Sequence, residues 1–132
     1  MFDQPNAAEL IAAARAHLEG QVIPTLTDAR LRFQTLVAAH VLAVVERELA
    51  LGEEALAAAY TRLAALDGAP ADPPAGPALA VAFEARSRAL CARIRAGAFD
   101  EGPQRDALLA HLRQTAIDEL RVANPKFLAG KG

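Results

Sequence analysis

The stretch from Leu36 to Val45 is apolar on every side of a helix except at one histidine, His40. A helix that is apolar all round must be surrounded by other helices. The stretch is too short to cross a bilayer, which takes about 20 apolar residues, and charged residues flank it at both ends. We therefore expect it to form the buried central element of an all-helical protein.

Helix start and stop signals divide the chain into about five helices. Asn6 and Glu9 have the spacing of a capping box at the start of a first helix. Asp28 can cap the central helix and Gly52 can end it. The pattern indicates no strand, so the predicted fold class is all-α, a compact bundle around the central helix. The expected helices run from Asn6 to about Gly20 and over about 28–51, 53–67, 78–96 and 103–124.

The segment 68–77 is rich in glycine and proline. Proline removes backbone donors and cannot continue a helix, so this segment predicts a linker. It either crosses between helices or separates two halves of the chain. Each half alone would be small for a stable core, and we therefore predict a single helical domain over 1–132.

Composition excludes several classes of partner. The net charge of −2 provides no basic field that would attract nucleic acid or an anionic membrane. Cys91 is the single cysteine, so no internal disulfide can form, and the first residues lack the pattern of a secretory signal. We expect a cytoplasmic protein that binds neither nucleic acid nor membrane. Basic residues are nearly all arginine, which together with abundant alanine suggests a GC-rich bacterial gene.

One face of the central helix brings together Phe33, His40 and Arg47, which lie two helical turns apart. Helical bundles build polar sites from such faces. Arg47 could then hold a small anion, with His40 as donor, acceptor or proton carrier. The alternative is structural: His40 bonds to a carbonyl or a neighbouring glutamate, and Arg47 complements a helix end.

Arg86 and Arg93 flank the apolar face of the helix expected at 78–96. An arginine beside a core either pairs with a carboxylate or serves an anion site. The sequence offers three carboxylates as structural partners, and both interpretations stay open. Those expected partners are Glu46, Glu48 and Glu119.

Motifs for metal, cofactor or nucleophilic chemistry are absent from the sequence. His17 and His111 stand alone on amphipathic helices, without a second ligand at metal-binding spacing. Glycines fall singly, so neither dinucleotide nor phosphate-loop patterns occur. We expect no metal and no cofactor, and the lack of a complete catalytic motif favours a non-enzymatic protein over an enzyme without deciding between them.

Three segments of the chain resemble an uncharacterised family of small helical bacterial proteins, a domain of unknown function. The segments are 3–10, 32–49 and 124–128, and the resemblance extends over nearly the whole chain. Genes of that family tend to neighbour those of acyl-CoA dehydrogenases and aminoglycoside-phosphotransferase-like kinases. The resemblance implies an accessory role near acyl-CoA metabolism. It assigns no catalytic residue, and the family often has a small polar residue where His40 stands.

Two functions follow as hypotheses. The first is a non-enzymatic helical interaction protein that binds or stabilises a partner enzyme, or that forms a homo-oligomer. The second is a bundle that binds a small anionic or acyl ligand, and is conceivably an enzyme. In the second, the ligand would contact His40, Arg47 and Phe33, with Arg86 or Arg93 from a facing helix.

Overall fold

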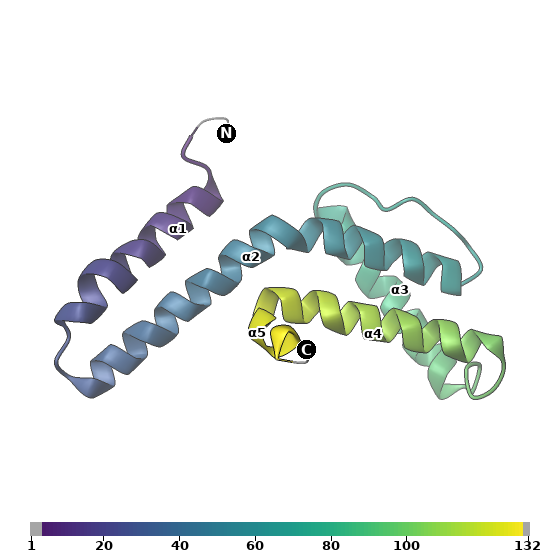
Figure 1. Ribbon diagram of the computed structural model, residues 1–132. Coiled ribbons are helices and arrows are strands. Elements are labelled where there is room, and N and C mark those ends of the chain that lie inside the picture. Colours follow the sequence, from purple (N-terminus) through teal and green to yellow (C-terminus); the bar gives the residue numbers. More distant parts are fainter. Residues whose placement is uncertain (1–3, 131–132) are drawn as a thin grey trace.

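The computed structural model describes residues 4–130, and every regular element within that range is helical. The all-α prediction is therefore confirmed. A π-helical turn η1 (Leu18–Val22) and a 3-10 turn η2 (Ile23–Thr25) join the first two α-helices. Residue 3 of the opening motif lies outside the described residues. The α-helices, shown in Figure 1, are α1 (Ala7–His17), α2 (Ala29–Leu66), α3 (Pro77–Arg95), α4 (Pro103–Ala123) and α5 (Pro125–Ala129).

Local capping signals begin the first two helices where the sequence indicates. The Glu9 backbone N–H donates to Asn6 Oδ1 at 2.9 Å, and the Asn6 N–H donates to Glu9 Oε2 at 2.8 Å. Asp28 accepts from the Leu31 N–H at 2.8 Å at the start of α2. Each cap satisfies backbone donors that the first helical turn leaves without partners.

The expected break at Gly52 is wrong, because α2 runs without interruption for 38 residues. The helices expected at about 28–51 and 53–67 are therefore one element. Glycine in a helix interior costs about 1 kcal/mol relative to alanine, but unlike proline it removes no hydrogen bond. The packing of α3 and α4 against the part of α2 beyond Gly52 offsets that cost.

The linker is a crossover. It leaves α2 at its end and returns along that helix, so that α3 begins beside the middle of α2 (Figure 1). Near the end of α3, Arg93 contacts Asp67 at the end of α2, and α3 is therefore parallel to α2. α4 then runs antiparallel: Thr115 contacts Arg62, and Val122 contacts Arg47.

The hydrophobic core lies in this C-terminal half. Leu63 of α2 has no exposed surface and packs in one buried cluster with Leu90, Phe99 and Leu108. These residues come from α2, α3, the turn after α3, and α4. The core therefore joins all three long helices at the end of α2 that is far from α1.

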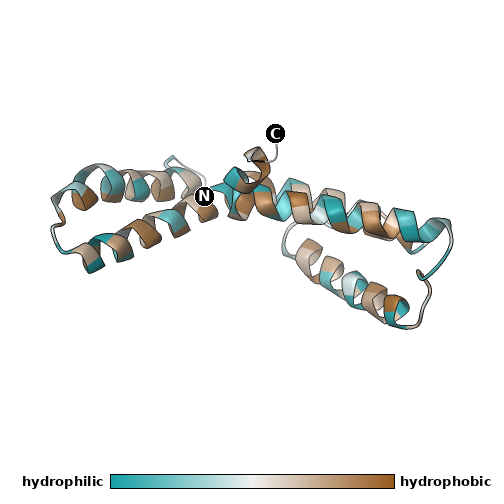
Figure 2. Cartoon of the chain, turned by 60° about the horizontal axis from the view of Figure 1, so that its bottom comes forward, coloured by the Kyte–Doolittle hydropathy of each residue, from teal (hydrophilic) through white to brown (hydrophobic). Residues whose placement is uncertain are grey.

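The expected burial of the apolar stretch is also wrong. His40 is exposed, and Val37 and Val41 keep 46% and 53% of their surfaces accessible. Among the described residues, α1 and the turns η1 and η2 that follow it pack along this part of α2, on the side of the buried Ala39. Figure 2 shows this two-helix arm, with hydrophobic segments along it, extending away from α3 and α4. Since a single neighbouring helix covers one side, the other apolar sides remain open.

Candidate functional site

A groove of about 790 Å³ lies between the middle of α2, the start of α3 and the end of α4. Its lining is mostly apolar and includes Leu56, Leu79, Phe83 and Val122. Small side chains such as that of Ala80 on α3 leave the groove open. Three separate helices therefore shape one elongated apolar surface that the chain itself does not fill.

Acidic side chains line the same groove. Glu48, Glu53 and Glu119 are exposed, whereas Asp118 is held by Arg62, with 3.6 Å between Nη2 and Oδ2. Among the described residues that line the groove, none is lysine or arginine. The groove thus combines an apolar lining with negative charge, which attracts cationic groups and repels anions.

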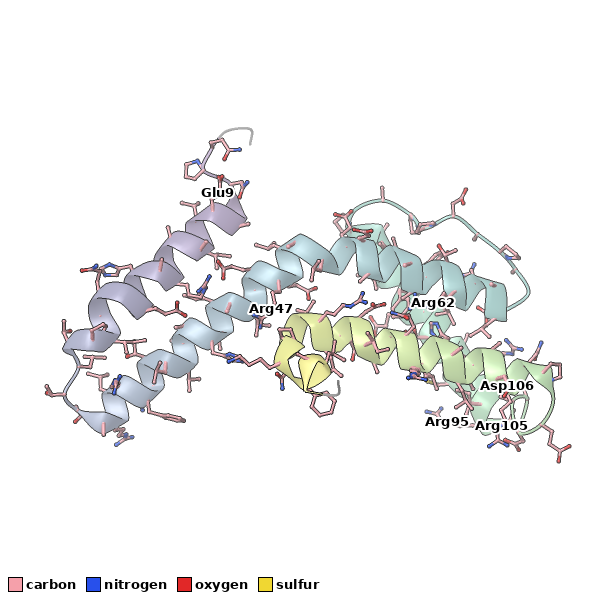
Figure 3. All side chains as sticks on the ribbon, viewed as in Figure 1. Glu9, Arg47, Arg62, Arg95, Arg105 and Asp106 are labelled. Atoms are coloured by element: carbon pink, nitrogen blue, oxygen red, sulfur yellow. The ribbon has the colours of Figure 1, made fainter. Side chains whose placement is uncertain are left out.

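Arg47 serves as a cap for another helix. Its Nε donates to the Val122 carbonyl oxygen at 2.6 Å, in the last turn of α4. Carbonyl groups at a helix C-terminus lack intrahelical donors, and a cation also complements the dipole there. Figure 3 shows Arg47 on α2 beside the end of α4. The contact resembles the structural alternative for Arg47, in which this side chain complements a helix end. The helix end that Arg47 contacts, however, is that of α4.

Arg86 and Arg93 converge on Asp67. Arg86 Nη1 lies 3.2 Å from Asp67 Oδ2, and Arg93 Nη1 lies 3.2 Å from Asp67 Oδ1. Their guanidinium groups also lie over aromatic rings, Arg86 over Tyr60 at 5.1 Å and Arg93 over Phe99 at 4.9 Å. The two arginines therefore pair the end of α2 with α3.

The prediction that Glu46, Glu48 or Glu119 would pair with these arginines is wrong. Glu46 pairs instead with Arg15 of α1, with 3.2 Å between Oε1 and Nη2. Neither Glu48 nor Glu119 forms an ion pair within the described part of the chain. A signal for Asp67 was available in the sequence: a carboxylate at a helix C-terminus opposes the dipole and requires a nearby cation.

The five candidate residues do not form one site. Phe33 and His40 are exposed on the first half of α2, and neither lines the groove. His40 and Asp67, which holds both arginines of α3, are separated by about 40 Å of helix at 1.5 Å per residue. The sequence did not identify the groove residues, because the apolar lining of the groove comes from three helices. The crossover linker determines which of these helices contact one another.

His111 is a buried histidine on α4. Burial, reinforced by the positive charge of Arg62, lowers the pKa of His111 from its ordinary value of 6.5. Its Nδ1 has no hydrogen-bond partner within the described residues. Figure 3 places Arg62 between α2 and α4. The imidazole is therefore kept neutral between these helices.

We predict that this lowered pKa makes stability depend on pH. Below the unfolded-state value of about 6.5, the unfolded chain binds a proton that folded His111 resists. The free energy of unfolding should then fall with decreasing pH, by at most about 1.4 kcal/mol per pH unit. His111→Gln should flatten the slope between about pH 7.5 and about pH 5.5 in urea denaturation, and exposed His17→Gln should keep it. Equal slopes in the two variants would rule out His111 as the source.

Comparison with known families identifies the chain. The model of a domain of unknown function, DUF6285, matches residues 24–127. The chain belongs to the DUF6285 family. No curated protein and no solved structure matches it. The matched range includes all of α2 and every residue of the groove, whereas α1 precedes it. The family resemblance noted in the sequence is confirmed.

Two structural observations accompany this family assignment. In the described range, no cluster of three or more histidine, cysteine, aspartate or glutamate side chains is placed to hold a metal ion. None of the helices described has the length and apolar character needed to cross a membrane.

Proposed function

We propose that this DUF6285 protein is a non-enzymatic interaction protein that binds a helix of a partner enzyme in the groove. The observation that supports the proposal is the pairing of an apolar lining from three helices with exposed carboxylates on α2 and α4. Amphipathic helices bind such grooves through apolar residues spaced three and four apart. From the family resemblance, we propose an enzyme of acyl-CoA metabolism as the partner.

The exposed carboxylates of the groove determine which charged side chains the bound helix should carry. Glu48, Glu53 and Glu119 would face lysine or arginine side chains beside the apolar stripe of the bound helix. Such pairs contribute more to association rate and specificity than to affinity. Binding should therefore weaken with salt without being abolished.

We further propose that residues 1–132 form one domain, because α2 runs through both halves of the chain. We also propose a cytoplasmic location in a bacterium, which the charge and the cysteine content of the chain support.

A small ligand is the second candidate, because the groove volume lies within the range of about 300–1,000 Å³ for ligand pockets. Its apolar lining suits an acyl chain. The carboxylates oppose an anionic head group, and Arg47, Arg86 and Arg93 already contact protein oxygen atoms. The protein partner is therefore the better supported of the two.

Filling the groove should abolish partner binding. Ala80 is exposed on α3 and lines the groove, so Ala80→Trp adds bulk there without disturbing the core. Ala89→Trp is the matched control, because it is exposed on the opposite side of the same helix. The tagged protein and both variants are incubated with extract of the native host, and bound proteins are identified by mass spectrometry. We expect one stoichiometric enzyme with the control and at least about a tenfold loss with Ala80→Trp.

A synthetic helix tests the chemistry directly. An amphipathic Leu/Lys peptide should bind the wild-type protein and the Ala89→Trp control, whereas its Leu/Glu counterpart should not, as measured by fluorescence anisotropy. Partner capture that is unaffected by Ala80→Trp, or equal binding of both peptides, would contradict the proposal. Thermal stabilisation by a long-chain acyl-CoA that disappears in Ala80→Trp would instead support the small-ligand function.

A further inference from the structure

The first half of α2 presents a second apolar surface, which meets the groove lining at Val44 and Glu48. Residues spaced three and four apart form one line along this helix, which we call the α2 seam. Val37, Val41 and Val44 occupy its middle. The α2 seam consists of Arg30, Gln34, Val37, Val41, Val44 and Glu48.

The α2 seam faces away from α1. Glu46, which pairs with Arg15 of α1, and the buried Ala39 are about 180° around the helix from the three valines. Val37 and Val41 are each about half exposed, and Phe33 beside them keeps 67% of its surface accessible. Two helices packed as a hairpin therefore leave Val37 and Val41 in water, where burial against another helix would be favourable.

The charges at the two ends of the α2 seam select its occupant. Arg30 stands at one end and Glu48 at the other, and neither forms an ion pair within the described residues. When a second copy of α2 lies antiparallel, Arg30 meets Glu48 of that copy at both ends of the contact. In the same register Val37 meets Val41. A parallel copy would instead oppose like charges at each end.

We propose that the α2 seam binds a second copy of this chain, forming an antiparallel two-fold dimer. The arrangement is closed, because each patch contacts the same patch of the other copy and leaves none available for further growth. The C-terminal halves with their grooves then lie at opposite ends of the dimer. The dimer contact shares Val44 and Glu48 with the groove lining, but the inference uses no enzyme partner, and the oligomeric state is measured independently of partner binding.

Charge reversal tests both the dimer and its register. Sedimentation equilibrium should give the wild-type protein twice the chain mass of 13.9 kDa. Arg30→Glu and Glu48→Arg should each weaken dimerisation by about tenfold or more, because two attractive contacts become repulsive. An equimolar mixture of the two variants should restore the dimer, because every reversed side chain then meets one of opposite charge.

Matched controls separate this interface from changes in folding. Arg32→Glu adds the same charge on the same helix, but away from the seam, and should remain dimeric. Val41→Glu should be monomeric with an unchanged helical circular dichroism spectrum, since Val41 is exposed in the monomer. A monomeric wild-type protein, or a mixture of reversed variants that stays monomeric, would overturn the proposal. An effect of Arg32→Glu equal to that of Arg30→Glu would overturn it as well.

Discussion

Leu63→Ala lowers the free energy of unfolding by about 3 kcal/mol, within the range of about 2–5 kcal/mol for a buried leucine. Leu63 has no exposed surface and joins Leu90, Phe99 and Leu108 in the core. Removing its side chain both loses buried apolar contact and leaves a cavity among three helices. Urea denaturation followed by circular dichroism measures the change.

Leu112→Ala is the control for the core prediction. Leu112 lies on α4 and is about half exposed, so the same truncation there should cost less than about 1 kcal/mol. Equal losses for the two variants would mean that the core lies elsewhere.

Asp67→Ala should lower the free energy of unfolding by about 1–2 kcal/mol. Its carboxylate accepts from Arg86 and Arg93, and together these pairs bind the end of α2 to α3. The arginines keep other contacts after the substitution, Arg86 with the Tyr60 hydroxyl and Arg93 with the Leu66 carbonyl. Partial exposure of all three charged groups limits the loss.

A double-mutant cycle separates the ion pairs from a general effect at the helix end. Arg93→Met combined with Asp67→Ala should cost less than the sum of the single changes, because both remove the same pair. High salt should reduce the effect of Asp67→Ala. Asp72→Ala in the exposed linker should change stability by less than about 0.5 kcal/mol. Strict additivity of Arg93→Met and Asp67→Ala would show that these residues do not stabilise each other.

Features that depend on a few neighbouring residues were predictable. Asn6 and Glu9 form their capping box, Asp28 caps α2, and proline stands in the first turn of both α3 and α4. The linker prediction is confirmed as well, because proline cannot continue a helix beyond its first turn. Gly52 was misjudged, since glycine only weakens a helix and packing beyond it decides whether the helix continues.

The candidate site depended on contacts between distant segments. Arg86 and Arg93 were correctly placed beside an apolar face, but their partner Asp67 comes from the end of another helix. Arg47 caps α4 at Val122, which is 75 residues farther along the chain. Periodicity gives the direction of a side chain around its own helix and contains no information about which other helix lies there.

The sequence by itself determined that this protein is helical, where most of its helices begin, and where its linker lies. It also marked Leu36 to Val45 as apolar all round. Only the tertiary structure decided that this stretch is half open and that the core forms around Leu63. Helix formation and capping are local, whereas burial depends on which helices reach a segment. Here the crossover after α2 directs α3 and α4 to its second half, whereas α1 and the turns that follow it pack along the first.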